Sequence, residues 1–105
     1  MTTAIAVLTT VATQADAERI ARALVERRLA ACVQLSAITS VYRWDGALQQ
    51  EAEVRLVVKT LAERYDAVVA ALHELHPYEL PAICALPFVH LDAPFAAWIA
   101  ASCSG

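Results

Sequence analysis

One long β-hairpin constrains the fold of this chain more than any other feature. β-Branched and aromatic residues run up to Asp45 and Gly46 and resume after them, which is the strongest short-range signal for a two-residue turn. The predicted hairpin covers residues 31–60, and each arm approaches about 45 Å at roughly 3.3 Å per residue. A chain of this length folds to a radius of gyration of only about 13 Å. The tip, with Tyr42 and Trp44, should therefore overhang the body and contact a partner surface.

Composition and charge limit the class of protein. The chain has 105 residues, of which 59% are hydrophobic, and this is enough for a core in one domain over residues 1–105. The formal net charge is −3 and the eight basic residues are scattered, so we expect no nucleic-acid partner. Residues 1–15 lack a basic start and are interrupted by polar side chains, which predicts neither a signal peptide nor a membrane span. Three cysteines without a C-x-x-C pair indicate reduced thiols and a cytoplasmic location.

Start and stop signals place the helices. Thr13 resembles a helix N-cap, and the helix that it opens has an apolar stripe at helical spacing. Thr60 and Glu63 form a predicted capping box that starts a second helix. This helix should end near His76, because Pro77 disfavours the α conformation in the residue before it.

The remaining strands complete a βαββαβ order. Apolar stretches predict strands over residues 3–10 and 83–90, and Pro87 favours a place at the sheet edge for the second of these. A short extra helix follows Asp92 at the C-terminal end. With right-handed crossovers, this order predicts an α+β, ferredoxin-like fold in which helices cover one face of an antiparallel sheet.

Alternation along the hairpin assigns its side chains to two faces. The face towards the helices should carry Val33, Leu35, Val41, Leu48, Val54, Leu56 and Val58. The opposite face, which includes Cys32, Trp44 and Leu86, is left without a predicted cover. Because so apolar a face would form an exposed patch, we expect copies of the chain to pack on it as a homo-oligomer.

Motifs of the common enzyme classes do not occur in the sequence. Gly46 and Gly105 are the only glycines, which excludes phosphate-binding and dinucleotide-binding loops. There is no nucleophile elbow, H-E-x-x-H pair or paired-cysteine zinc motif. We therefore expect a binding protein and not an enzyme.

One polar constellation follows the second helix. His76, Tyr78 and Glu79 lie on a segment stiffened by two prolines, and a stiff segment loses little entropy on binding. Imidazole and thiolate both suit copper or zinc. His76 could hold such an ion with His73, one helical turn earlier, and Cys32 could do so with Cys84 only across a subunit boundary. The simpler interpretation is that His76 caps the helix end and that Cys32 is a small buried apolar residue.

The charged positions of the hairpin also have two interpretations. Glu51 and Lys59 belong to an arm of alternating charge, which is usually a solvated face. On an overhanging arm they would instead line a ligand cleft at a subunit interface, together with Trp44, Tyr78 and Glu79. Trp44 is equally suited to fill a pocket of a partner.

Several segments taken together resemble a known family. They are Ala30-Ala31-Cys32-Val33, Thr39 to Gly46, Glu53-Val54, Lys59-Thr60, Leu75 to Glu79 and Ala97-Trp98-Ile99. Over residues 4–102 the chain resembles the CutA divalent-cation-tolerance family. The resemblance implies a ferredoxin-like homotrimer similar to the trimers of the PII signalling proteins. It also implies a role in tolerance of divalent metals, copper above all, without an assigned reaction.

The same resemblance implies a weak copper site. Some members have a cysteine where this chain has Thr9 and a histidine where it has Leu75, which leaves His76. We therefore expect a trimer that binds copper(II) or another divalent cation weakly, through His76 and a thiol such as Cys32 from another subunit. The alternative is a PII-like signalling or scaffold module whose clefts bind a small ligand or a protein partner.

Overall fold

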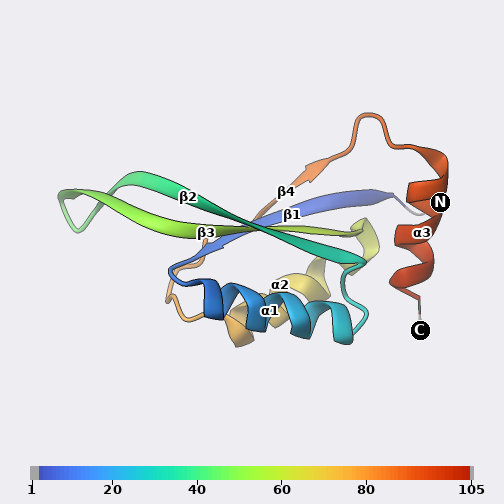
Figure 1. Cartoon of the computed structure of the whole chain (residues 1–105), viewed down its shortest axis with the longest axis horizontal. Coiled ribbons are helices and arrows are strands. Elements are labelled where there is room, and N and C mark those ends of the chain that lie inside the picture. Colours follow the sequence, from blue (N-terminus) through green and yellow to red (C-terminus); the bar gives the residue numbers. More distant parts are fainter. Residues whose placement is uncertain (1–2, 105) are drawn as a thin grey trace.

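The computed structural model describes residues 3–104, which form a four-stranded sheet and three α-helices. In chain order the elements are β1 (Ala4–Val11), α1 (Gln14–Glu26), β2 (Cys32–Trp44), β3 (Ala47–Leu61), the short 3-10 helix η1 (Ala62–Arg64), α2 (Tyr65–Leu75), β4 (Cys84–Pro87) and α3 (Ala93–Ser102). The sheet order is β2-β3-β1-β4 and every pairing is antiparallel. Helices α1 and α2 lie on one face, and α3 lies at the end remote from the hairpin tip (Figure 1). The predicted α+β, ferredoxin-like order with an extra C-terminal helix is confirmed.

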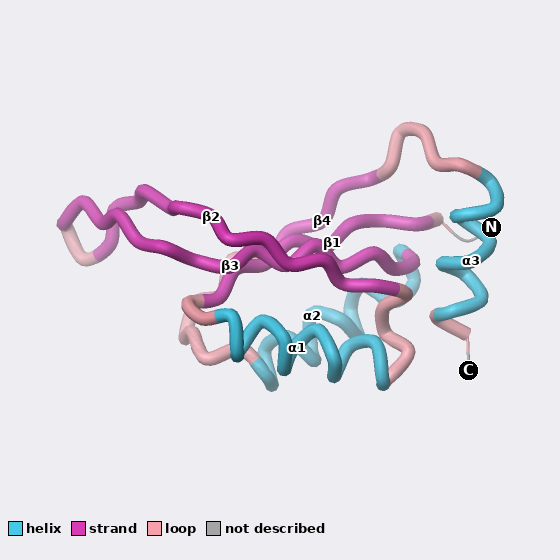
Figure 2. The backbone as a smooth tube through the Cα atoms, in the orientation of Figure 1, coloured by secondary structure: helices cyan, strands magenta, loops and turns pink. Residues whose placement is uncertain are grey.

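Strands β2 and β3 form the long hairpin that the sequence predicts. Their pairing continues without interruption from the turn to Cys32, which lies opposite Lys59. Asp45 and Gly46 have φ angles of 52° and 77°, the left-handed conformations that favour this tight turn. The two strands contain 13 and 15 residues, and the molecule is 45 Å long but only 26 Å wide. The tip therefore projects beyond the helices (Figure 2).

The main core lies between the sheet and the two helices α1 and α2. The Thr13 hydroxyl caps α1 as predicted, because it accepts a hydrogen bond of 3.1 Å from the Asp16 N–H. Fully buried side chains from both layers meet in this core: Val7, Val11, Ile20, Leu24, Leu56, Val58, Val68 and Leu72. Helix α2 ends at Leu75 with His76 as its C-cap, as Pro77 predicts. The segment after α2 therefore starts from a fixed point in the core.

Val41 and Leu48 correct the predicted extent of the helix-covered face. Both side chains have the alternation expected for that face, but both are exposed, whereas Leu56 on the same face is fully buried. The reason is the length of the hairpin. Helices α1 and α2 cover only its inner part, and the end of the hairpin that holds Val41 and Leu48 extends past them (Figure 1).

The predicted capping box at Thr60 and Glu63 is wrong. Thr60 is a buried residue of β3 opposite Ile5, and its hydroxyl donates to the Leu29 carbonyl oxygen at 2.6 Å. The helical region begins only at η1, whose N-cap, Leu61, makes no side-chain capping bond. The Thr60 hydroxyl is directed to Leu29, and the pairing of β3 with β1 continues to Leu61, so the strand runs through this position.

Strand β4 lies at a sheet edge, as Pro87 predicts, and is shorter than the expected stretch over residues 83–90. Helix α3 forms a second, smaller core at the other end of the molecule, where Ile99 and Cys103 pack with Ala4 and Leu61. None of the helices found in residues 3–104 has both the length and the apolar character needed to cross a membrane.

Candidate functional site

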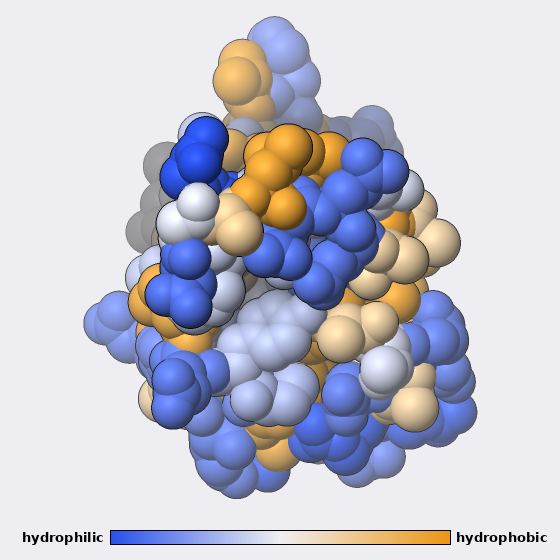
Figure 3. Space-filling model, turned by 90° about the vertical axis from the view of Figure 1, so that its left-hand side faces the viewer, coloured by the Kyte–Doolittle hydropathy of each residue, from blue (hydrophilic) through white to orange (hydrophobic). Residues whose placement is uncertain are grey.

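Residues 3–104 leave much of the sheet face opposite α1 and α2 uncovered (Figure 1). Cross-strand neighbours share a face, and the register places Cys32, Cys84 and Leu86 on this one. Leu86 is 53% exposed, Cys84 is exposed and Cys32 is half-buried. Viewed from the hairpin end, apolar side chains stand among hydrophilic ones (Figure 3). We call the face that carries Cys32, Cys84 and Leu86 the open sheet face.

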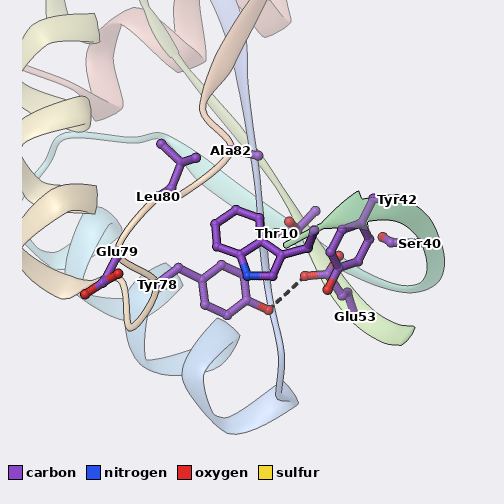
Figure 4. Close-up of a pocket in the computed structure, with 9 residues that line it drawn as sticks. Thr10, Ser40, Tyr42, Glu53, Tyr78, Glu79, Leu80 and Ala82 are labelled. Carbon is purple, nitrogen blue, oxygen red and sulfur yellow. Dashed lines mark hydrogen bonds between the residues drawn. The ribbon is translucent and has the colours of Figure 1, made fainter. Parts of the chain in front are cut away.

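A cleft with a volume of about 570 Å³ lies where the hairpin meets the segment after α2. We call it the hairpin cleft, and it is lined by Thr10, Ser40, Tyr42, Trp44, Glu53, Tyr78, Glu79, Leu80 and Ala82. Strand β1 supplies the first of these, the hairpin the next four and the segment after α2 the last four (Figure 4). A cleft of this volume, with aromatic and aliphatic groups and a few polar ones, has the usual features of a small-molecule site.

A hydrogen bond joins two sides of the hairpin cleft. The Tyr78 hydroxyl donates to Glu53 Oε2 at 2.8 Å, and Tyr42 lies on the other side of this carboxylate (Figure 4). Burial raises the pKa of Tyr78, and the bond to Glu53 raises it further. Loss of solvent, followed by the charges of Glu51 and Glu53, raises the pKa of Tyr42. Both phenols therefore stay neutral at physiological pH in a cleft of negative potential.

Trp44, Tyr78 and Glu79 are predicted cleft residues that the structure brings together in the hairpin cleft. Glu51 and Lys59 do not line this cleft of a single copy, and their place in a cleft between subunits stays a prediction. Alternation fixes the face of a strand side chain but not its distance from a site. The two residues lie on either side of the part of β3 that reaches the cleft.

The remaining lining residues were not predicted from the sequence to belong to a cleft: Thr10, Ser40, Tyr42, Glu53, Leu80 and Ala82. A signal existed for some of them, because Ser40, Tyr42 and Trp44 alternate along one face of β2. Thr10 and Leu80 gave no local signal. Their place in the cleft depends on how the segment after α2 packs against the sheet, which is a tertiary contact.

His76 is buried after α2, and both of its ring nitrogens form hydrogen bonds. Nδ1 accepts from the Tyr78 N–H at 3.1 Å, so Nε2 carries the proton and donates to the Thr10 carbonyl oxygen at 2.8 Å. Burial lowers the pKa of His76, although the bond to Thr10 acts in the opposite direction. The neutral imidazole thus joins the cleft segment to β1, and neither nitrogen has a free lone pair for a metal.

The burial of neutral His76 predicts a loss of stability in acid. Below the ordinary histidine pKa of 6.5 the unfolded chain binds a proton that the folded chain resists, so the free energy of unfolding should fall as the pH drops. The stability that the neutral imidazole retains is fully present above pH 6.5. It is lost as the pH falls through the lower pKa that His76 has in the folded chain. Urea denaturation at pH 7.5 and 5.5 measures the loss.

Two variants control this pH experiment. His76→Gln should reduce the difference between the two pH values, whereas His73→Gln should retain it, because His73 is exposed on the same helix. Equal pH dependence in the wild type and in His76→Gln would show that other groups cause the acid loss.

Cys32 and His76 do not meet in one chain. Cys32 and Ala6 both lie opposite Lys59 of β3, so they are level in the sheet. His76 binds the carbonyl oxygen of Thr10, which is four residues further along β1 than Ala6. This offset alone is about 13 Å at roughly 3.3 Å per residue. Among residues 3–104, no three His, Cys, Asp or Glu side chains are grouped so that they could hold a metal ion. The predicted pair is therefore not a site within a single copy.

These features define a ferredoxin-like α+β chain with an overhanging hairpin, an open sheet face and a cleft beside the hairpin. The sequence pattern of the family described as CutA1 divalent ion tolerance protein matches residues 5–102. The chain therefore belongs to the CutA1 family, as its motifs predict.

Relatives agree over nearly the whole chain. The divalent-cation tolerance protein CutA of Escherichia coli O45:K1 is 37% identical over 102 residues, which cover 96% of this chain and 91% of that protein. The structure of CutA from Synechococcus elongatus has a TM-score of 0.95 and 38% identity, covering 99% of this chain and 93% of that one. The periplasmic divalent cation tolerance protein CutA from Archaeoglobus fulgidus has a TM-score of 0.94 and 33% identity, with 96% and 99% covered.

The Archaeoglobus fulgidus protein also corrects the predicted cytoplasmic location. That relative is described as periplasmic, which points away from the location that we inferred from unpaired cysteines. The structure supplies a physical reason for one of the three cysteines. Cys103 is buried in the smaller core with Ile99, and a cysteine that packs as a small apolar residue gives no information about the redox compartment.

Proposed function

We propose that this protein acts in divalent-cation tolerance as a homotrimer that binds a divalent ion such as copper weakly, without catalysing a reaction. Membership of the CutA1 divalent ion tolerance family supports this role. The single observation on which the trimer rests is the open sheet face, where Leu86 is exposed in one copy. Packing of copies on this face would remove an apolar patch from water.

Two thiols favour a soft ion on the open sheet face, because thiolates are preferred ligands of copper and zinc. Cys32 and Cys84 share the face but belong to β2 and β4 at its opposite edges, about 14 Å apart across the intervening strands. A neighbouring copy would therefore supply the second ligand. His76 is the other candidate, and an ion there must displace the bond to Tyr78 or to Thr10, which keeps binding weak.

Native mass spectrometry with added Cu(II) tests this proposal. The wild type should give a trimer with copper bound, and Cys32→Ser or His76→Ala should remove the copper while the trimer mass remains. Cys103→Ser is the matched control, because that thiol is buried away from the open sheet face and its loss should leave copper binding unchanged. A wild-type trimer without copper, or copper that survives both substitutions, would contradict the metal role.

The hairpin cleft favours a second function, that of a PII-like signalling or scaffold module that binds a small ligand. The supporting observation is a cleft of about 570 Å³ whose lining includes Trp44, Tyr78 and Glu79. The cleft residues come from three separate parts of one chain, so a bound ligand would hold those parts together. A ligand that binds only the folded state would also raise the melting temperature.

A further inference from the structure

The overhanging part of the hairpin begins where β1 ends. The pairing of β3 with β1 stops at Val54, which lies opposite Val11, whereas the pairing of β3 with β2 continues to the turn. Within the described residues 3–104, the hairpin beyond this point is a ribbon of only two strands, residues 38–53, which we call the outer ribbon. Two-stranded ribbons twist strongly and are marginally stable on their own. Strand pairing alone therefore fixes the direction of the outer ribbon only weakly.

The segment after α2 passes around this end of β1 on its way to β4 (Figure 1). It leaves the helix layer at His76, whose Nε2 donates to the Thr10 carbonyl oxygen at 2.8 Å. Two residues later, the Tyr78 hydroxyl donates to Glu53 Oε2 at 2.8 Å. Glu53 is six positions from Lys59 and alternates onto the same face, which is the open sheet face. The segment thus connects the helix layer to the opposite face of the sheet.

The bond from Tyr78 is made at the inner end of the outer ribbon, because Glu53 is the first residue of β3 without a partner in β1. Tyr78 is itself held from two sides. Its N–H donates to His76 Nδ1 at 3.1 Å, and its ring packs on the imidazole with the ring centres 4.9 Å apart. Pro77 between them restricts the backbone. All of these contacts lie within one chain, so they do not depend on which surfaces neighbouring copies cover.

A small change at this point has a large effect at the tip. Gly46 is seven positions from Glu53 along β3, which is about 23 Å at roughly 3.3 Å per residue. A rotation of about 10° at Glu53 would therefore move the tip by about 4 Å. A displacement of this size is comparable to the contact distance between packed side chains, so it would disrupt a packed contact with another copy.

We propose that Tyr78 is a positioning residue that sets the direction of the outer ribbon and so presents its tip, with Trp44 and Leu48, to a neighbouring copy. The inference rests on the homotrimer proposed above and names the bond within each chain that prepares the hairpin for assembly. A hydrogen bond to a carboxylate suits this role, because it is stronger than a bond between neutral groups.

Tyr78→Phe tests the inference, because it removes the hydroxyl and keeps the ring. Amide hydrogen exchange should become at least about five-fold faster in the outer ribbon and stay unchanged in residues 54–61. In analytical ultracentrifugation, the concentration at which the trimer dissociates should rise about ten-fold, the lower end of what a hydrogen bond to a charged group contributes. Tyr65→Phe is the matched control. Tyr65 belongs to α2 and packs against the main core, so this variant should keep both wild-type values.

Variants of Glu53 show whether the bond itself matters. Glu53→Leu removes the acceptor and should reproduce both effects of Tyr78→Phe. The double variant should be no worse than either single one, because both substitutions break the same bond. Glu53→Gln retains an acceptor oxygen for the Tyr78 hydroxyl and should have a smaller effect than Glu53→Leu. Equal losses in Glu53→Gln and Glu53→Leu would show that the charge of Glu53 acts and not its bond to Tyr78, which overturns the inference.

The exchange and sedimentation measurements separate the possible failures. A wild-type protein that stays a single chain contradicts both the homotrimer and the presentation of the tip to a neighbour. A wild-type trimer whose exchange and dissociation are unchanged in Tyr78→Phe overturns the inference alone. Faster exchange in the outer ribbon without weaker assembly also overturns it, because the direction of the ribbon would then not matter to the trimer.

Discussion

Leu56→Ala is expected to lower the free energy of unfolding by about 2–5 kcal/mol, the usual range for a leucine that leaves a cavity in a packed core. Leu56 is 0% exposed in the core between the sheet and the helix layer, with Ile20, Leu24 and Leu72. Urea denaturation followed by circular dichroism measures the change. A loss below about 1 kcal/mol would show that the site collapses around the smaller residue or that the core is not packed as described.

Leu48→Ala is the matched control for this experiment. Leu48 occupies the same strand and has the same alternation as Leu56, but it is 71% exposed because the hairpin overhangs the helices. The substitution should change the free energy of unfolding by less than about 0.5 kcal/mol. A loss that grows on dilution would indicate a contact between copies at this position, and a loss as large as that of Leu56→Ala at every concentration would contradict the overhang.

Leu86→Glu is expected to have the second large effect, namely dissociation of the assembly. Leu86 is 53% exposed on the open sheet face, where we propose that copies pack. A carboxylate buried there without a partner costs several kcal/mol, so the variant should sediment as a smaller species than the wild type at the same micromolar concentration. Each copy should keep its own core, because the substituted side chain lies outside it.

Val25→Glu controls for the added charge. Val25 is also an exposed apolar residue, but it belongs to α1 in the helix layer. This variant should retain the sedimentation of the wild type. If Val25→Glu dissociates the assembly and Leu86→Glu does not, the copies pack through the helix layer, and the proposal about the open sheet face is wrong.

The parts of the fold that short-range rules determine were predictable from the sequence. Asp45 and Gly46 define the turn because few residue pairs adopt two left-handed conformations in succession. Pro77 ends α2 at Leu75 because a proline restricts the residue before it. The hairpin register then follows from the turn, and with it the assignment of side chains to faces.

The parts that failed depend on three-dimensional packing. Thr60 fits a capping pattern, but burial in β3 and a bond to Leu29 determine its role. Leu48 has the alternation of a core residue and lies beyond the helices that would cover it. In both cases the local sequence pattern is present, but contacts with distant parts of the chain, or their absence, determine the environment of the residue.

The candidate site was likewise predictable from the sequence only in part. Trp44, Tyr78 and Glu79 were predictable as cleft residues because aromatic and charged side chains stood out on the hairpin and on a stiff segment. The bond from Tyr78 to Glu53 was not predictable, since it joins residues 25 positions apart through the packing of that segment. The two hydrogen bonds of His76 were equally hidden, and they change its interpretation from a ready metal ligand to a structural link.

Sedimentation equilibrium of the purified wild-type protein at micromolar concentration tests the central claim most directly. Packing of three copies on the open sheet face predicts a mass near 34 kDa, three times the 11.3 kDa of one chain. A well-behaved species of 11.3 kDa would contradict the assembly and, with it, the proposal that a metal ion is shared between copies.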